Sequence, residues 1–490
     1  MWSGRLVASI CAGPCCAKFK RSMPVIFDQA GDFTAKIPVV VIGGGACGLI
    51  AALTLRDAGV ECVVLERDAL PSGSTALSSG FIPACDTRWQ HAAGVVDSVD
   101  QMAVDIGTKN HHGANAAVVQ AVCAASGPTL QWLADSHGIP FQLLQGFLYP
   151  GHGVERMHAV PEKTGAGLMG RLLEAARKAE IDLLCDSPVS DLFATADGRI
   201  TGVRVTRPDG SREDIGCDAL ILACNGFGGN RDMVHRYLPE IADAQYAGHS
   251  GNQGDAVRWG EALGAAIADM GAYQGHGSLA TPHGMLITWA LMTEGGVQVN
   301  ALGERFWNEH EGYSEAAVHV LEQPGRVAWA IYDQRLHTLG LTFPDYLEAK
   351  KLGALKQADS AAGLAALCGL PVAALAATLD QVGTLCKNGG TDTYGRTFVA
   401  EQALTPPYFA IKVTGALFHT QGGLEIDAGC RVQRVGGHTF PNLFAAGGAA
   451  RGVSGGAVWG YLSGNGLLTA CAQGRIAGQN AALFARPLSA

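Results

Sequence analysis

The sequence predicts an α/β fold, and the first evidence is a strand, a helix and a second strand in direct succession. The run IPVVVI at Ile37–Ile42 is continuously apolar, as expected for a parallel strand buried on both faces of its sheet. Leu49 to Ala58 are predicted to form a helix that Gly59 closes, and Cys62–Leu65 are predicted to form a second buried strand. Strands that alternate with helices indicate a parallel sheet covered by helices.

A glycine-rich loop, GGGACG, joins the first strand to the helix. Gly43, Gly45 and Gly48 have the G-x-G-x-x-G spacing. The first permits a tight turn, the second lets backbone N–H groups approach a pyrophosphate at the helix N-terminus, and the third allows close packing of helix and strand. Glu66 follows the second strand about 20 residues on, where a carboxylate accepts hydrogen bonds from ribose hydroxyls. The context predicts a bound dinucleotide, and the alternative is a glycine-rich turn without a ligand.

The composition is that of a protein with a large core and no nucleic-acid partner. The 490 residues are 48% hydrophobic and 16% charged, enough for roughly two or three domains. Asp and Glu outnumber Lys and Arg by 44 to 35, so the net charge is -9. No basic run is present, which argues against nucleic acid. No apolar run approaches the roughly 18 residues of a membrane span, so we expect no transmembrane segment.

Cysteine and histidine usage indicates a reducing compartment and no metal. The 14 cysteines are dispersed, which is typical of buried thiols, and we expect a cytoplasmic protein. His111-His112 and the pair His276/His283 lack zinc spacing and cysteine partners. Residues 1–35 are expected to be an N-terminal extension. Its LVASICAG is a poor signal-peptide core, and the alternatives are an unstructured extension or a start codon placed too early.

Seven further segments, taken together and in order, resemble the flavoprotein family of fumarate reductase, urocanate reductase and 3-ketosteroid dehydrogenases. The similarity runs from about Ile37 to the end of the chain. The segments are GSTALSSGFIPA (73–84), ALILACNGFGGN (219–230), GNQGDAVRWGEALGA (251–265), GERFWNE (303–309), FHTQGGLEID (418–427), NLFAAGG (442–448) and GRIAGQNAA (474–482).

The resemblance implies an FAD-binding Rossmann-like domain with an inserted α+β cap domain. We expect residues 36–270 and 404–490 to form the FAD-binding domain and residues 271–403 to form the cap. The Ala/Leu-rich stretch 354–377 is predicted to be helical and broken at Pro371. Relatives with covalent flavin carry a histidine in the segment Gly73–Gly80, and this chain has none there, so dissociable FAD is expected. No second strand, glycine loop and helix of this kind is predicted, so we expect an unidentified electron donor or acceptor in place of a nicotinamide domain.

The expected FAD contacts combine the glycine loop with the resembling segments. A helix starting near Gly466 would aim its positive N-terminus at the flavin. The residues expected to bind FAD are Gly43, Gly45, Ala46, Gly48, Glu66, Arg67, Ser74, Thr75, Ser79, Gly80, Val189, Ala223, Asn225, Gly226, Gly254, Asp255, Gly447, Gly448, Gly464, Asn465 and Leu467.

The loop VWGYLSGNG (458–466) carries the predicted catalytic pair. Dicarboxylate reductases of the family have an arginine where this chain has Tyr461. The Tyr-x-Ser pattern resembles instead the 3-ketosteroid Δ4-dehydrogenase branch. The resemblance implies that Tyr461 and Ser463 donate hydrogen bonds to a ketone oxygen and that Tyr313 accepts the proton. The alternative is that these side chains are structural.

Three further sets of residues each have two possible roles. Arg305 and Glu309 match the pair that fumarate reductases use as a proton relay, or they form an ion pair that holds the cap to the FAD-binding domain. His419 is expected to bind a substrate oxygen or to bond to the backbone. The loop YPGHGVERMH (149–158), with its histidines and Arg156, is either a grip for a carboxylate or a solvated surface turn.

The sequence therefore predicts an FAD-dependent oxidoreductase that adds or removes hydrogen across a CH–CH bond beside a carbonyl. The first expected substrate is a ketosteroid-like ketone. The alternative substrate is a small carboxylic acid, as for a fumarate reductase or a tricarballylate dehydrogenase. A third reading is a non-catalytic protein with an FAD-binding fold.

Overall fold

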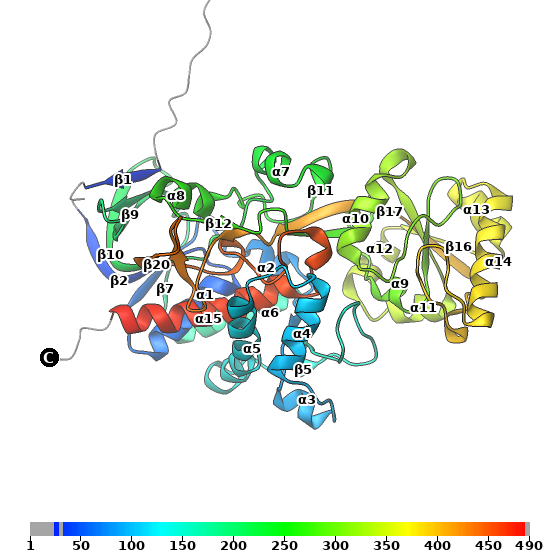
Figure 1. Cartoon of the computed structure of the whole chain (residues 1–490), viewed down its shortest axis with the longest axis horizontal. Helices are drawn as coiled ribbons and strands as arrows, with labels where there is room; N and C mark the ends of the chain where they lie inside the picture. The colour runs from blue at the N-terminus through cyan, green and yellow to red at the C-terminus, as the bar shows by residue number, and fades with distance from the viewer. Residues whose placement is uncertain (1–23, 29–32, 486–490) are drawn as a thin grey trace, which may run out of the picture.

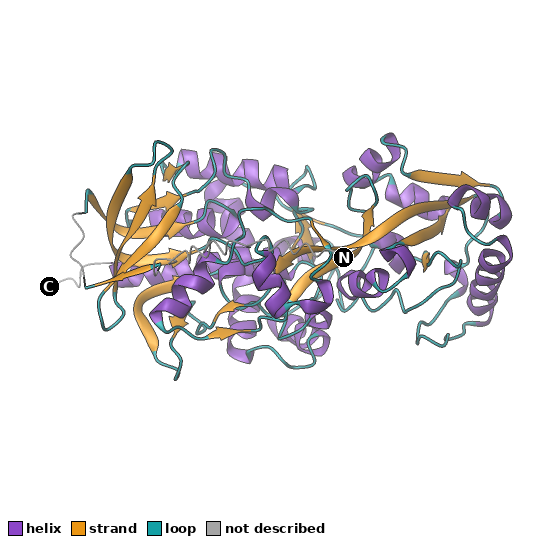
Figure 2. Ribbon diagram, turned by 90° about the horizontal axis from the view of Figure 1, so that it is seen from above, coloured by secondary structure: helices purple, strands orange, loops and turns teal. Residues whose placement is uncertain are grey.

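The chain folds into two lobes that lie end to end (Figures 1 and 2). The computed structural model describes residues 24–28 and 33–485. The main lobe is built on a nine-stranded sheet, and the cap lobe on a six-stranded sheet, counted within those residues. The part of the expected N-terminal extension at 1–23 lies outside the described residues. Further on, Val25–Phe27 form β1, which pairs in parallel with β8 (Val189–Ala194).

The main sheet is parallel at its centre, as the apolar strands predict. β10 (Arg212–Leu222) pairs in parallel with both β2 (Ala35–Ile42) and β20 (Thr439–Ala445), so strands from the two ends of the chain meet here. The parallel order continues through β3 (Cys62–Leu65) to β7 (Asp182–Leu184). β9 (Ile200–Thr206) lies antiparallel between β8 and β10, and β19 (Arg431–Gln433) pairs with β20.

Two helices from opposite ends of the sequence pack together beside this sheet. α1 (Ala46–Asp57) begins three residues earlier than the sequence predicts, and α15 (Asn465–Ala485) lies against it. Glycines of α15 allow the close approach: a Cβ at Gly474 would lie 2.6 Å from the Cys47 carbonyl oxygen, and one at Gly478 would lie 2.7 Å from that of Ala51. The two helices therefore run in the same direction, with the start of α1 beside the middle of α15.

The other elements of the main lobe are short or cover its faces. They are α2 (Gly73–Leu77), β4 (Ile82–Pro83), α3 (Arg88–Ala92), α4 (Val99–Lys109), α5 (Ala116–His137), β5 (Gln142–Leu143), β6 (Met157–Ala159), α6 (Gly165–Lys178), α7 (Arg231–Tyr237), η1 (Pro239–Ile241), α8 (Asp255–Leu263), β12 (Ile267–Ala268), β18 (Gly423–Leu424), η4 (Gly447–Ala449) and η5 (Val458–Gly460).

The cap sheet is organised by one long strand that runs between the lobes (Figure 1). β17 (Tyr408–Thr420) pairs with β15 (Ala328–Asp333) and β16 (Leu355–Ala358) through its first half, and with β13 (Tyr273–Ala280) and β11 (Gln245–Tyr246) toward its end. β14 (Val297–Val299) pairs with β15. The first residues of the expected segment 404–490 thus belong to the cap sheet, and β17 leads directly from the cap into the residues around His419.

Helices surround the cap sheet, and one stretch that the sequence predicts to be helical begins with a strand instead. The predicted helical stretch 354–377 contains strand β16 followed by two helices, which are separated near Pro371 as expected. Leu355–Ala358 are extended because the edge of β17 offers them backbone partners. The cap helices are α9 (Ala290–Thr293), α10 (Tyr313–Leu321), η2 (Pro324–Arg326), α11 (Gln334–Gly340), α12 (Pro344–Lys351), α13 (Ala361–Cys368), α14 (Val372–Asn388) and η3 (Ala400–Gln402).

Candidate active site

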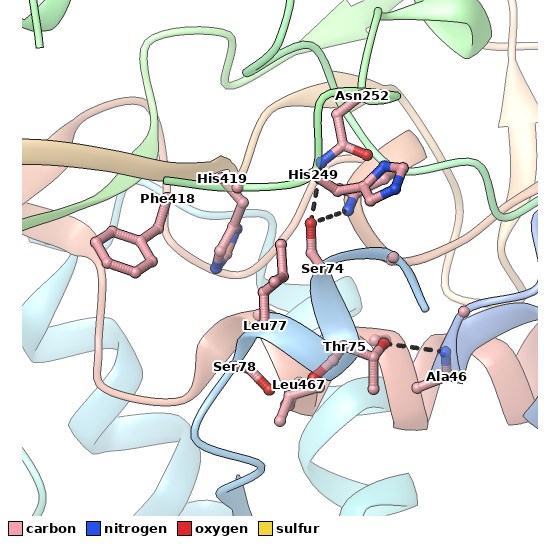
Figure 3. A pocket seen from close by; sticks show the side chains of 18 of the residues that line it. Ala46, Ser74, Thr75, Leu77, Ser78, His249, Asn252, Phe418, His419 and Leu467 are labelled. Carbon is pink, nitrogen blue, oxygen red and sulfur yellow. Dashed lines mark hydrogen bonds between the residues drawn. The ribbon is translucent and has the colours of Figure 1, made fainter. Parts of the chain in front are cut away.

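A cavity of about 340 Å³ lies where the two lobes meet. Its first side is formed by the glycine loop after β2 and by the segments around Ser74 and Asp255, and its second by aromatic side chains around Tyr461. Figure 3 shows polar side chains of the first side together with His419 and Phe418 from the end of β17. Residues far apart in the sequence therefore share one cavity.

The glycine loop is shaped so that a side chain could not replace its first and third glycines. Gly43 has a φ of +109°, and a Cβ there would lie 2.5 Å from the Ala223 carbonyl oxygen. A Cβ at Gly48 would lie 1.9 Å from the Gly43 carbonyl oxygen. Gly45 precedes α1 and offers its N-terminus no side-chain cap. A helix N-terminus at the cavity wall suits an anionic phosphate group.

The acid after β3 both orders this loop and lines the cavity. One carboxylate oxygen of Glu66 accepts from the backbone N–H of Gly44 at 2.7 Å, and the other accepts from that of Asp68 at 3.0 Å. Neighbouring Arg67 donates to the Gly251 carbonyl oxygen at 2.5 Å and lies 3.8 Å from Asp255. The guanidinium group is thus already engaged on the glycine-loop side.

A serine on α2 links two asparagines across this side of the cavity. The side-chain amide of Asn252 donates to Ser74 Oγ at 2.9 Å (Figure 3). The side-chain amide of Asn225 donates to the same oxygen at 3.0 Å. Thr75 Oγ1 accepts from the Ala46 N–H at the start of α1 at 3.1 Å. These bonds fix α2 against the glycine loop, so the segment that resembles the flavoprotein family lies beside the helix N-terminus.

Tyr461 lies on the second side, with its ring buried and its hydroxyl directed at polar groups. The hydroxyl donates to Gln274 Oε1 at 3.2 Å and accepts from the Gly466 N–H at 3.4 Å. The Tyr313 ring lies 6.0 Å from the Tyr461 ring and stacks on His276 at 4.6 Å. Ser463 also lines the cavity. Three hydroxyl-bearing residues expected at the site therefore lie together.

Burial keeps both phenols neutral. It raises the pKa of Tyr461 above its ordinary value. Burial also raises the pKa of Tyr313, and the Tyr461 phenol adds to the shift, whereas hydrogen bonds from Ser463 and the Gly464 N–H oppose it. Both groups are therefore hydrogen-bond donors at neutral pH, and Tyr313 in its resting state does not favour the phenolate that a proton acceptor needs.

The two histidines on this side are neutral as well. Burial lowers the pKa of His419 to about 4 and that of His276 to about 3. His419 Nδ1 lies 3.1 Å from the Gln421 side-chain amide, and a Cβ at Gly466 would lie 2.5 Å from its Nε2. His419 thus faces the N-terminus of α15, where it lines the cavity without a positive charge.

Comparison with known proteins agrees with this geometry. The model of the FAD binding domain family matches residues 38–467 of the 490. The chain belongs to this family. A probable fumarate reductase, Ifc3, of Shewanella frigidimarina (strain NCIMB 400) is 29% identical over 449 residues, which cover 91% of this chain and 75% of that protein.

Two solved structures are similar over most of their length. One is the open conformation of a flavocytochrome c3 fumarate reductase, with a TM-score of 0.78 and 28% identity over 93% of this chain and 80% of that one. The other is 3-ketosteroid-Δ4-(5α)-dehydrogenase from Rhodococcus jostii RHA1 in complex with 4-androstene-3,17-dione. Its TM-score is 0.74, with 25% identity over 93% of this chain and 98% of that one. The protein is therefore an FAD-dependent oxidoreductase acting on CH–CH groups.

The cavity fits FAD, because the tight turn at Gly43 and Gly48 and the start of α1, where Gly45 has no side chain, lie beside it. Four of the residues expected to bind FAD lie behind the lining: Gly48, Gly226, Gly254 and Asn465. Asn465, for example, donates to Ser454 Oγ at 3.0 Å. The others line the cavity: Gly43, Gly45, Ala46, Glu66, Arg67, Ser74, Thr75, Ser79, Gly80, Val189, Ala223, Asn225, Asp255, Gly447, Gly448, Gly464 and Leu467.

Arg305 and Glu309 lie outside the cavity lining, in an ion network of the cap. Glu309 is fully buried and pairs with Arg305 at 2.5 Å and with Arg396 at 2.9 Å, and Arg305 also pairs with Asp392. Burial alone would raise the pKa of Glu309, but the two arginines lower it to about 2. All four members lie within 271–403, so the network joins parts of the cap to one another.

The loop with Arg156 is neither a surface turn nor an open grip for a carboxylate. Arg156 is 1% exposed, and its guanidinium group pairs with Asp97 at 2.8 Å and Asp105 at 2.5 Å. His152 Nε2 lies 3.0 Å from the Ser463 carbonyl oxygen. The sequence prediction of a solvated turn is wrong because two acids from a distant segment neutralise this arginine. The buried cluster supports the loop that carries Ser463.

Several residues that line the cavity were not predicted from the sequence to lie at the site. Gln274 and His276 lie on β13, Tyr149 lies in the loop before β6, and Phe343 and Asp345 lie at the start of α12. In the sequence, His276 stands out only as one of a pair with His283 that lacks zinc spacing. Among the described residues, no group of His, Cys, Asp and Glu is suited to a metal ion. No helix in the same part of the chain is long and apolar enough to span a bilayer.

Proposed function

We propose that this enzyme dehydrogenates, or hydrogenates in reverse, the CH–CH bond beside the carbonyl of a ketosteroid-like ketone. One observation carries the proposal: neutral hydroxyls, and no guanidinium or ammonium group, surround the cavity near Tyr461. Among the described residues that line the cavity, Arg67 is the single arginine or lysine, and it is engaged on the glycine-loop side. A neutral carbonyl oxygen suits such donors.

A small carboxylic acid is the second candidate, because the chain resembles a probable fumarate reductase. A carboxylate held away from water needs a cation or several strong donors. His419 and His276 would have to supply the charge, and their pKa values of about 4 and 3 keep them neutral at neutral pH. Asp345 also lines the cavity and would repel an anion. These groups support the ketone over the carboxylate.

The proposed roles follow from where the side chains lie. Tyr461 and Ser463 would donate hydrogen bonds to the carbonyl oxygen as negative charge develops on it. Tyr313 would exchange a proton with the α carbon; it donates in the reductive direction, and in dehydrogenation the bonds from Ser463 and Gly464 stabilise the transient phenolate. FAD, when bound, supplies the acceptor or donor of the hydride. His419 would orient the substrate as a neutral donor or acceptor.

FAD would be held on the glycine-loop side without a covalent bond. The N-terminus of α1 and the glycine loop would hold the pyrophosphate, and Glu66 the ribose. No histidine lies in Gly73–Gly80, the segment that carries one in relatives with covalent flavin. Acid precipitation of the protein should release all of the yellow colour into the supernatant. Flavin that stays with the pellet would contradict this assignment.

A bleaching assay tests the substrate class. The holoenzyme is mixed under anaerobic conditions with a panel of saturated ring ketones and with a panel of di- and tricarboxylates, and the flavin absorbance is followed. Ketones are expected to bleach the flavin and carboxylates to leave it oxidised. Bleaching by carboxylates alone would discard the ketone, and no bleaching by any compound would contradict the dehydrogenating direction.

The remaining assignments are the partner and the compartment. The electron donor or acceptor would be a separate redox carrier, because among the described residues the glycine loop at 43–48 joins the long buried strand β2 to a helix, whereas the second G-x-G-x-x-G spacing, at 165–170, lies inside α6. Every cysteine in the described part of the chain is a free thiol, and this supports a cytoplasmic location.

A further inference from the structure

The cavity wall continues from Tyr461 into the cap as a series of aromatic rings in contact. The Tyr313 ring lies 6.0 Å from Tyr461 and 6.2 Å from Tyr149. Phe147 then lies 5.3 Å from Tyr149 and 5.9 Å from Phe343 at the start of α12. Four of these five rings line the cavity directly. An elongated apolar molecule held by its carbonyl at Tyr461 would therefore extend along this wall toward α12.

A carboxyl group lies at the α12 end of that wall. Asp345 lines the cavity two residues after Phe343. No hydrogen bond or ion pair joins its carboxyl group to any other described residue. Burial alone raises its pKa, which means that no nearby positive charge compensates the lost hydration. A carboxylate in the first turn of a helix also interacts favourably with the helix dipole. A fully solvated carboxylate would make the same interaction without losing hydration.

We propose that Asp345 is a specificity residue that accepts a hydrogen bond from a hydroxyl or ammonium group at the end of the substrate remote from the ketone. The inference rests on the proposed function and adds the substrate's second polar group. The expected substrate is thus a long, rigid, apolar ketone with a donor at its far end. A substrate with a carbonyl or carboxylate at that position would face the lone pairs of Asp345 and bind less well.

The expected selectivity comes from the hydrogen bond that the ligand offers in place of the water that Asp345 has lost. A carboxylate that lines an apolar wall has lost part of its hydration and gains no bond from the protein in return. A donor brought by the ligand restores one strong hydrogen bond to a charged group, which is worth at least about tenfold in affinity. A ligand without a donor at that end leaves the lost hydration of the carboxylate uncompensated. Selectivity is therefore expected in the dissociation constant and KM more than in kcat.

The test uses the holoenzyme and fused-ring ketones that are identical except at the far end. The four far ends are a hydroxyl, an ammonium, a keto group and a plain methylene. Dissociation constants are measured from the change in the flavin absorbance spectrum under anaerobic conditions, and KM and kcat are measured with an artificial electron acceptor. The variants are Asp345→Asn, which keeps the shape, and Glu348→Gln on the same helix, whose carboxylate pairs with Lys351 outside the cavity lining.

Wild type and Glu348→Gln are expected to bind the donor-bearing ketones at least about tenfold more tightly than the methylene compound. In Asp345→Asn the ammonium advantage should disappear and the hydroxyl advantage should shrink to a few-fold. An ammonium preference that stays at about tenfold in Asp345→Asn, or no donor preference in wild type while all four ketones are turned over, would overturn this inference alone. Failure of every ketone to bind would overturn the proposed function together with it.

Discussion

Replacement of Tyr461 by phenylalanine removes a single hydroxyl group from the centre of the candidate site. The ring is 5% exposed, and its contacts with Tyr313 and His419 remain. Removal of the hydroxyl breaks its bonds to Gln274 and Gly466. A half-buried amide oxygen and a half-buried backbone N–H lose this partner, at a cost of about 1–3 kcal/mol of stability. If the hydroxyl is one of the donors to the developing charge, turnover should fall by at least about tenfold and up to about a thousandfold.

Stopped-flow reduction of the flavin by a ketone substrate measures this loss, and the flavin-to-protein absorbance ratio shows whether FAD remains bound. Tyr332→Phe is the matched control, because it removes a buried tyrosine hydroxyl, bonded to Tyr346 at 2.7 Å, that lies away from the cavity. The control should lose a similar amount of stability and none of the turnover. Unchanged turnover in Tyr461→Phe, or an equal loss in both variants, would refute the role of the hydroxyl.

Three further outcomes are expected. Gly48→Ala should abolish FAD retention in the purified protein, because its Cβ would lie 1.9 Å from the Gly43 carbonyl oxygen; the flavin-to-protein ratio measures this. Glu309→Gln should lower the free energy of unfolding by about 3–5 kcal/mol, since Arg396 would lose its buried partner, while flavin absorbance below the transition stays intact. The free energy of unfolding should fall as pH drops from 6.5 to about 4. The pKa of His419 is about 4 in the folded chain against an ordinary value of 6.5, so the unfolded state binds more protons in this range. Chemical denaturation across the range checks this, and His419→Gln should flatten the slope.

Each of these outcomes has its own control. Gly170→Ala adds a methyl group to α6 where nothing lies within 4 Å and should leave FAD bound. Glu162→Gln removes an exposed partner of Arg171 and should cost about 1 kcal/mol or less. A Gly48→Ala protein with full flavin content, a Glu309→Gln protein as stable as the Glu162 variant, or a stability that rises on acidification would each contradict the corresponding reasoning.

The sequence by itself determined the core of the main lobe. Ile37–Ile42, the glycine loop and the residues up to Glu66 form the predicted strand, turn, helix and strand. Their signals are local: an apolar run, a glycine spacing and a helix period each depend on residues a few positions apart. The resemblance to flavoproteins carried this prediction to FAD, and the family match over 38–467 confirms it.

Only the tertiary structure decided which charges are available at the site. Arg156 looks exposed in the sequence, but Asp97 and Asp105, more than 50 residues earlier, bury and neutralise it. Leu355–Ala358 read as helix and form a strand because β17 lies beside them. Asp345 carries no motif, and its place in the cavity depends on how the cap meets the main lobe. Propensity and spacing are properties of neighbours along the chain, whereas burial, ion pairing and the shape of a cavity depend on residues that meet only when the chain has folded.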